Sequence, residues 1–307
     1  MLSRLATLID TYDWRKRYKA YKEGVAATSR PDIGFYKTKK AQYRYRCSGT
    51  GPTIVFLCDP PNVIESYDAL FAALSPHYRV IVLEAAGMGF SAANNRYGFA
   101  FEETSDDLIH FLKSVAGEGA ILAFSCVSGL AAIDIAVRYP ELVSRLFLIQ
   151  TTDWDGFHIW MNGCDPKGLL RKPFLGQLGI KKVGEKQGLK WIETVTGNPD
   201  TVQPLCCCAR QGFENDMLFS LASSFQRYIR GESPLRRPTQ PMTILWGEAD
   251  KSHSPESIER SRTLGEDVQI ILRPTLGHFP ELEDPQGLSD ILQALEPVSE
   301  TPETSTG

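Results

Sequence analysis

A cysteine stands at a turn from an apolar run into a helical pattern, in the segment FSCVSG at residues 124–129. A strand that turns sharply into a helix forms a nucleophile elbow, which presents one side chain at its tip. Small residues are needed around such a turn, and Val127, Ser128 and Gly129 follow Cys126. Phe124, however, stands where glycine is usual. The pattern predicts Cys126 as a catalytic nucleophile, with an inert buried thiol as the alternative.

Two other residues complete a set that can do chemistry with a thiol. Asp250 follows the apolar run MTILWG, and His278 follows the run VQIILRP. The order along the chain is nucleophile, acid, histidine, with each residue in a loop after a strand. We expect His278 to pair with the Cys126 thiolate and move its proton, and Asp250 to fix the imidazole tautomer. The alternatives are a helix-capping role for Asp250, with Glu248 or Asp153 as the acid, and a structural role for His278.

The electrostatic surroundings of this cysteine are expected to activate it. A free thiol has a pKa of ~8.5, and a helix N-terminus and a histidine both favour the thiolate. We therefore predict an apparent pKa for Cys126 well below that of an ordinary thiol. General acid–base assistance from His278 is worth ~10²–10⁴-fold in rate.

Alternating strands and helices must position these residues. Apolar or period-two runs predict strands over 34–40, 41–49, 53–59, 79–85, 120–124, 145–150, 242–247 and 268–274. Helical patterns lie between them, over 67–74, 101–117, 130–143, 255–264 and 287–295. This alternation predicts an α/β fold with a mostly parallel, doubly wound sheet.

The alternation of strands and helices is interrupted once, and further segments lie at both ends of the chain. Residues 153–238 are helical and irregular with no clear strand, so we expect a cap or lid between the core segments 34–152 and 239–296. Residues 1–33 form an N-terminal extension with apolar positions at helical spacing, which predicts one amphipathic helix. We expect this helix to cover part of the core, to contact a second copy of the chain or to shape the substrate entrance. The polar tail 297–307 is expected to be disordered.

Composition excludes several classes of partner. The chain of 307 residues has a net charge of −4, which would not attract nucleic acid or anionic lipid. An apolar stretch that could span or anchor in a membrane is missing from the sequence. The seven cysteines form neither a disulfide framework nor a spaced metal-ligand pattern. We expect a cytoplasmic protein that acts on a small molecule without cofactor or metal, either alone or as a homodimer.

Several motifs in this order resemble the α/β-hydrolase superfamily over roughly residues 34–295. They are GMGFS at 87–91, the segment SCVSGLAAIDIAVRYPELVSRLFLI from 125, WGEAD at 246–250 and GHFPELEDP at 277–285. The resemblance implies a triad of Cys126, Asp250 and His278. It also implies an oxyanion hole in which one backbone donor is Val127. The second donor position falls on Pro60, which has no N–H, unless Asp59 or Asn62 donates instead.

Other chemistry-bearing residues are expected to have secondary roles. Ser125, Asp153, Trp154 and His158 are placed in or near the substrate pocket. The cap aromatics are expected mainly to pack the lid, cysteines 206–208 to fill space, and His253 to lie on the surface or in the lid.

Three functions are compatible with these residues. The first is hydrolysis of an ester, thioester or lactone of a small hydrophobic substrate through an acyl-enzyme. The second is elimination of acetate from an acetylated ring. The stretches CDPPNVIESYDAL, GFSAA, FSCVSG and PFLGQL are similar to hydrolase-fold enzymes of polyketide tetronate pathways that catalyse this step. The third is an inactive hydrolase fold that binds a small molecule, which follows if Phe124 and Pro60 spoil the site.

Overall fold

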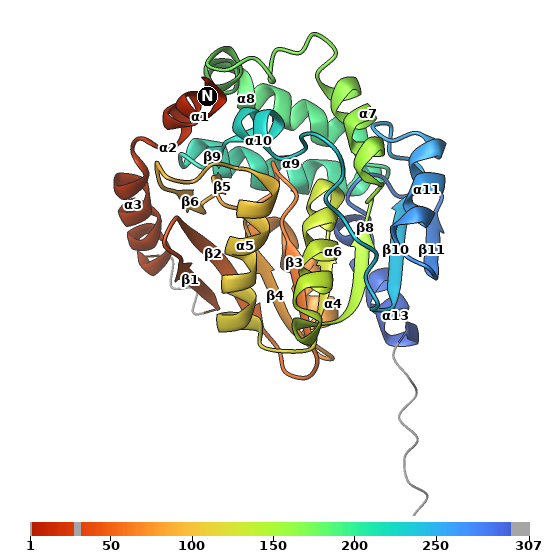
Figure 1. Cartoon of the computed structure of the whole chain (residues 1–307). Coiled ribbons are helices and arrows are strands. Elements are labelled where there is room, and N and C mark those ends of the chain that lie inside the picture. Colours follow the sequence, from red (N-terminus) through yellow and green to blue (C-terminus); the bar gives the residue numbers. More distant parts are fainter. Residues whose placement is uncertain (1, 28–31, 296–307) are drawn as a thin grey trace, which may run out of the picture.

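A single large sheet forms the centre of the computed structural model, which describes residues 2–27 and 32–295 (Figure 1). Its strand order is β1-β2-β4-β3-β7-β8-β10-β11, with β6 paired to β2. The pairs from β4 to β11 are parallel, whereas β2 is antiparallel to β1, β4 and β6. The strands are β1 (Ile33–Lys37), β2 (Ala41–Ser48), β3 (Thr53–Leu57), β4 (Arg79–Leu83), β6 (Ala92–Ala93), β7 (Ala120–Phe124), β8 (Val143–Ile149), β10 (Met242–Gly247) and β11 (Val268–Arg273).

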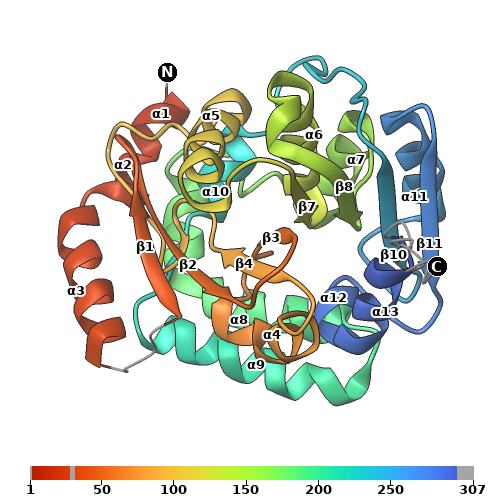
Figure 2. The same cartoon turned by 90° about the horizontal axis from the view of Figure 1, so that it is seen from below.

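Helices cover both faces of the sheet because its inner strands are apolar on both sides. In β3, Val55 and Leu57 belong to one hydrophobic cluster, while Ile54 and Phe56 belong to the other. Figure 2 shows α5 and α6 on one side of the sheet and α4 and α13 on the opposite side. The core helices are α4 (Asp68–Leu74), α5 (Phe101–Phe111), α6 (Gly129–Arg138), α11 (Pro255–Ser261), α12 (Pro280–Glu283) and α13 (Pro285–Leu295). The predicted fold class is therefore confirmed.

Short helical turns connect or extend several of these elements. They are η1 (Ile64–Tyr67), η2 (Leu112–Ala116), η3 (Cys126–Ser128), η4 (Pro140–Leu142) and η5 (Arg262–Leu264).

Helices of the segment between β8 and β10 lie over the carboxyl-terminal edge of the sheet (Figure 1). They are α7 (Trp154–Cys164), α8 (Leu175–Val195), α9 (Pro199–Glu214) and α10 (Leu221–Arg227). The segment also contains the short strand β9 (Leu218–Phe219), which pairs with β5 (Met88–Gly89) and ties this layer to the core. Sequence periodicity could not detect it, because two residues are too few to show an alternation.

Three helices stand where one was predicted at the N-terminus: α1 (Leu2–Ala6), α2 (Leu8–Thr11) and α3 (Trp14–Ala27). The predicted apolar face is wrong for Leu2 and Leu8, which are 60% and 41% exposed. The polar side faces inward instead, where the Asp10 carboxylate accepts a 2.6 Å hydrogen bond from Ser223 of α10. Helices α1 and α2 pack against the cap helices α10 and α8, so their apolar periodicity does not identify the buried face, whereas α3 contacts β6 of the sheet and buries Tyr21 of the predicted face.

The predicted disordered tail, and residue 296 of the predicted core, lie outside the described residues. Within the described ranges, no helix combines the length and the apolar character needed to cross a bilayer.

Candidate active site

Four polar side chains lie at the carboxyl ends of neighbouring parallel strands. Asp59 follows β3, Cys126 follows β7, Asp250 follows β10 and His278 follows β11. The carboxyl ends of parallel strands meet at one edge of a sheet, where ligands bind in open α/β folds. Residues up to 219 positions apart in sequence are thereby brought into hydrogen-bonding distance.

Cys126 sits on a sharp turn between β7 and the helical residues that follow. Its φ is +53°, a left-handed conformation that costs a non-glycine residue about 1–3 kcal/mol. Thr151 stabilises the turn, because its hydroxyl donates a hydrogen bond to the Cys126 carbonyl at 3.1 Å. A Cβ on Gly129 would come within 2.2 Å of the Thr151 hydroxyl, which explains the need for glycine there. The elbow forms even though Phe124 replaces a glycine, because the Phe124 side chain is buried in the core.

His278 lies between two carboxylates and beside the thiol. Its Nδ1 is 2.6 Å from Oδ2 of Asp250, and its Nε2 is 3.0 Å from Oδ2 of Asp59. The Cys126 sulfur, an Asp59 oxygen and a ring nitrogen of His278 all lie within 4.8 Å of one another. Since Nδ1 is bound to Asp250, the nitrogen on the cysteine side is Nε2. The structure therefore brings Cys126, Asp250 and His278 together, and adds Asp59 to them.

The Asp250 carboxylate is saturated with hydrogen bonds. Besides His278, Oδ2 accepts from Nε2 of Gln150 at 2.8 Å and Oδ1 accepts from the Ser252 N–H at 2.7 Å. Burial raises the pKa of Asp250, but the two histidines beside it outweigh burial and hold that pKa well below its usual range. Asp250 is thus a fixed anion that orients His278, whereas the alternative acid Glu248 is exposed.

His253 is a second histidine on the same carboxylate. Its Nδ1 lies 2.9 Å from Oδ2 of Asp250, and its ring stacks on His278 with centroids 5.3 Å apart. Burial lowers the pKa of His253, so the ring is neutral at neutral pH. The prediction of a surface or lid position is therefore wrong, since only 3% of the side chain is exposed. In the sequence, the feature that indicates a place beside the site is the position of His253 three residues after Asp250.

The resting protonation state differs from the sequence prediction. Burial, with a further contribution from the Asp59 carboxylate, raises the pKa of Cys126 to about 11. Burial disfavours a charged His278, but Asp250 and Cys126 outweigh it and raise the pKa of His278 well above its ordinary range. The predicted low thiol pKa is wrong because the thiol is only 2% exposed and faces a carboxylate. At neutral pH the pair consists of a thiol and an imidazolium.

The loop after β3 offers few backbone donors to a developing oxyanion. The Asp59 N–H points to the Tyr67 hydroxyl at 3.4 Å, and the Asn62 N–H donates to the Asp59 carbonyl at 3.1 Å. Pro60 and Pro61 between them have no N–H. Asp59 and Asn62 therefore do not supply the free backbone donor that Pro60 lacks. The Val127 N–H, by contrast, is directed at the Cys126 sulfur.

The predicted pocket residues have identifiable structural partners. The Asp153 carboxylate caps α7 by accepting from the Gly156 N–H at 2.7 Å, and it lies 3.4 Å from Nη1 of Arg260. Trp154 donates to the Gly231 carbonyl at 3.0 Å and packs against His158. These three residues thus anchor the start of the cap. From the cap, the rings of Phe157 and Trp160 contact His253 and the ring of Trp191 contacts His278.

Glu281 is a buried acid that the sequence analysis did not single out. Its Oε1 accepts a 3.1 Å hydrogen bond from the Ser125 hydroxyl, directly before the elbow. Burial raises the pKa of Glu281 to about 8, so the carboxyl is mostly protonated at neutral pH. Ser125 is therefore engaged with this acid, which supports the elbow from the side of α12. Its place in the segment GHFPELEDP was the available signal.

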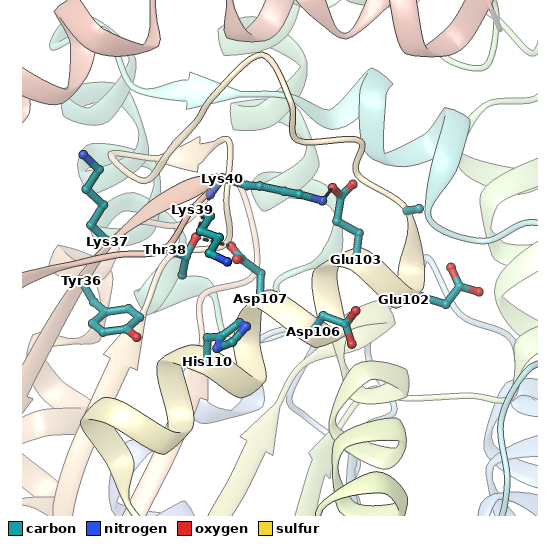
Figure 3. A pocket seen from close by; sticks show the side chains of 11 residues that line it. Tyr36, Lys37, Thr38, Lys39, Lys40, Glu102, Glu103, Asp106, Asp107 and His110 are labelled. Carbon is teal, nitrogen blue, oxygen red and sulfur yellow. Dashed lines mark hydrogen bonds and ion pairs between the residues drawn. The ribbon is translucent and has the colours of Figure 1, made fainter.

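Cys126 is almost fully buried, with 2% of its surface exposed. Two surface pockets, of about 830 and 600 Å³, are lined by other parts of the molecule. Figure 3 shows the larger one, between the β1–β2 turn and α5, where Lys40 forms an ion pair with Glu103. The smaller one lies between α3, β2 and α9. Neither of these two pockets includes Cys126 or His278.

Comparisons with known proteins agree with this architecture. A model of the Alpha/beta hydrolase family matches residues 54–291. Pimeloyl-[acyl-carrier protein] methyl ester esterase of Nitrosospira multiformis is 24% identical over 245 residues, which cover 77% of this chain and 91% of the esterase. Strigolactone esterase D14 of Arabidopsis thaliana is 25% identical over 266 residues, which cover 81% of this chain and 94% of that protein.

Solved structures share the fold at lower sequence identity. An epoxide hydrolase of Bacillus megaterium superposes with a TM-score of 0.67 at 15% identity, covering 85% of this chain and 99% of the other. A hydrolase of Pseudomonas aeruginosa PA01 gives a TM-score of 0.68 at 18% identity, covering 87% of this chain and 98% of the other. These structures support the arrangement of sheet and helices described above.

Proposed function

The chain belongs to the alpha/beta hydrolase family, and from this premise we propose that it hydrolyses an ester, thioester or lactone of a small hydrophobic substrate through Cys126. One observation supports this proposal most: the thiol lies on a positive-φ elbow beside a histidine whose Nδ1 is 2.6 Å from Asp250. The nucleophile, the base and the carboxylate that orients the base then have the spatial arrangement that acyl transfer requires.

The site is activated when the resting pair, the Cys126 thiol and the His278 imidazolium, loses one proton. The resulting thiolate attacks the substrate carbonyl carbon, a C–S bond forms, and the carbonyl electrons move onto oxygen. We expect the Val127 N–H, which is directed at the Cys126 sulfur, to stabilise that oxyanion. The C=O bond then re-forms, the bond to the leaving group breaks, and Nε2 of His278 protonates the departing oxygen or sulfur. His278 next takes a proton from water, whose oxygen displaces Cys126 and releases the carboxylic acid.

A second reaction is favoured by the loop after β3. An elimination forms no tetrahedral oxyanion, so it does not need the backbone donors that this loop lacks. A basic group, Asp59 or neutral His278, would remove a C–H proton next to the acetylated carbon of a ring. A C=C bond then forms, the C–O bond breaks and acetate leaves. The substrate would be an acetylated ring intermediate of polyketide tetronate biosynthesis.

Turnover in oxygen-18-labelled water separates these reactions. The wild-type chain and Cys126→Ala are incubated with a panel of small aromatic and alicyclic acetates and lactones, and the products are analysed by mass spectrometry. Hydrolysis places the label in the released acid and leaves an alcohol, whereas elimination leaves an unlabelled acid and a new double bond. The proposal predicts labelled acid with the wild type and loss of turnover with Cys126→Ala. Undiminished turnover by that variant would contradict it.

A further inference from the structure

The three donor atoms around the elbow have the chemistry of a zinc site. They are a thiol sulfur, an imidazole nitrogen and a carboxylate oxygen, from Cys126, His278 and Asp59. Zinc binds sulfur, nitrogen and oxygen donors, and sites with three protein ligands leave a fourth position for water or another ligand. The sequence predicts no metal site because these residues are not locally spaced, whereas the fold assembles them from three loops.

The distances suit a tetrahedral ion. With bonds of about 2.3 Å to sulfur and about 2.0–2.2 Å to nitrogen and oxygen, ligand atoms lie roughly 3.3–3.6 Å from one another. Here Nε2 of His278 and Oδ2 of Asp59 are 3.0 Å apart, and all three donors lie within 4.8 Å of each other. An ion between them would need adjustments of about 1.5 Å or less in these separations. The side chain of Asp59, 14% exposed, is the most exposed member of the set.

Asp250 supplies an independent feature of a metal site. A metal-binding histidine usually donates its second ring N–H to a carboxylate, which fixes the ring and increases its basicity. Asp250 stands in that position, 2.6 Å from Nδ1 of His278, and is itself held by Gln150. A thiolate, one carboxylate and a neutral imidazole would also balance the charge of a dication in this buried place.

We propose that Zn²⁺ binds between Cys126, His278 and Asp59 and reversibly blocks the nucleophile. The bound ion takes the sulfur lone pair that would attack a carbonyl and the Nε2 lone pair that would accept a proton. Binding displaces the thiol proton, so affinity falls as the pH falls. Inhibition by zinc depends on the proposed function of Cys126 as a nucleophile. Binding of zinc at this site does not depend on that function.

Binding is measured first, without any substrate. Chelator-treated, full-length protein is titrated with Zn²⁺ by calorimetry, and with Co²⁺ while the thiolate-to-metal charge-transfer absorption is recorded. Cys126→Ser and Asp59→Asn remove one ligand each, while Cys207→Ser removes an exposed thiol elsewhere as the matched control. We expect one ion per chain and loss of the charge-transfer band in Cys126→Ser. We expect binding more than about tenfold weaker in Asp59→Asn, since loss of an outer partner alone costs about 10–100-fold.

Protection of Cys126 from alkylation provides a second readout on the unaltered protein. Zinc should slow modification of Cys126 by iodoacetamide, and a chelator should restore it. Binding unchanged by both ligand substitutions, or abolished by Cys207→Ser, would overturn the proposal, as would unprotected Cys126 at saturating zinc. If zinc binds as described but no ester is turned over, the zinc site stands and the hydrolase proposal fails.

Discussion

Replacing Asp59 by asparagine is the most informative single perturbation of the proposed reaction. In the resting state the Asp59 carboxylate lies 3.0 Å from Nε2 of His278 and stabilises the imidazolium. It also contributes to the raised pKa of Cys126, about 11. Activation removes one proton from the thiol–imidazolium pair, so a positive charge beside Asp59 is lost or a negative charge appears there. Asp59→Asn should therefore favour the reactive state and increase hydrolysis at neutral pH.

The expected size follows from the distance and the burial. Two unit charges about 4 Å apart interact by about 4 kcal/mol at an effective dielectric constant of 20. Partial exposure of Asp59, 14%, and screening by salt reduce this value. We take about 1.4–2.8 kcal/mol as the remaining effect, which corresponds to about a 10- to 100-fold increase in the reactive protonation state. The variant should approach the wild-type rate at high pH, where both proteins are deprotonated.

A pH–rate profile with an activated aryl ester measures this effect. The wild-type kcat/KM should rise from neutral to alkaline pH, and the rise should begin at lower pH in Asp59→Asn. The rate of Cys126 alkylation by iodoacetamide against pH, followed by peptide mass spectrometry, should shift in the same direction. Glu248→Gln is the matched control, because it removes an exposed carboxylate close in sequence to Asp250 without touching His278.

A loss of activity in Asp59→Asn at every pH would refute this reasoning. Asp59 would then be required by the reaction, as expected if it removes a C–H proton in an elimination. An equal change in Glu248→Gln would show a general effect of charge rather than the contact at Nε2.

Two further predictions concern stability. Burial raises the pKa of Glu281 from 4.5 to about 8, so the folded state keeps a proton that the unfolded state loses as the pH rises through this range. Wild-type stability should fall from pH 4.5 to 8, and Glu281→Gln should remove up to about 4 kcal/mol of that fall, as measured by urea unfolding. In Gly277→Ala the new Cβ would lie 2.1 Å from the Val195 carbonyl oxygen, which should cost about 2–3 kcal/mol and lower the melting temperature. The control Gly163→Ala meets no atom within 4 Å on helix α7 and should be neutral or stabilise by up to about 1 kcal/mol. A pH-independent wild-type stability, or equal melting temperatures for the two alanine variants, would contradict these assignments.

The sheet and the positions of the triad candidates could be predicted because both depend on local sequence. Apolar runs define the strands, and a polar residue directly after such a run must lie at the carboxyl edge of a parallel sheet. For this reason the sequence can place Cys126, Asp250 and His278 at that edge, although it does not give their distances.

The contacts that set the electrostatics could not be predicted in this way. The sequence indicates Asp59 as a residue of the oxyanion hole, but its contact with His278 spans 219 positions of sequence and depends on how the loop after β3 folds. His253 carries no apolar period that would place it under the cap. The predicted low pKa of Cys126 failed for the same reason, since burial and the Asp59 charge are tertiary properties.

The N-terminal helices show a limit of periodicity itself. Their leucines repeat at helical spacing, yet they face outward, and the side with Ser3, Thr7 and Asp10 is buried. Hydrophobic spacing identifies an amphipathic helix but not the surface against which it packs. Here the Asp10–Ser223 hydrogen bond to α10 accompanies the inward orientation of the polar side.

Trapping the covalent intermediate tests the role of the thiol most directly. Wild-type protein, Cys126→Ala and His278→Ala are mixed with an activated ester, quenched in acid within the first turnover and examined by intact and peptide mass spectrometry. We expect one acyl group on Cys126 of the wild type, which decays as acid is released, and none at this position in either variant. Ester turnover by a wild type that never carries an acyl group on residue 126 would contradict the account.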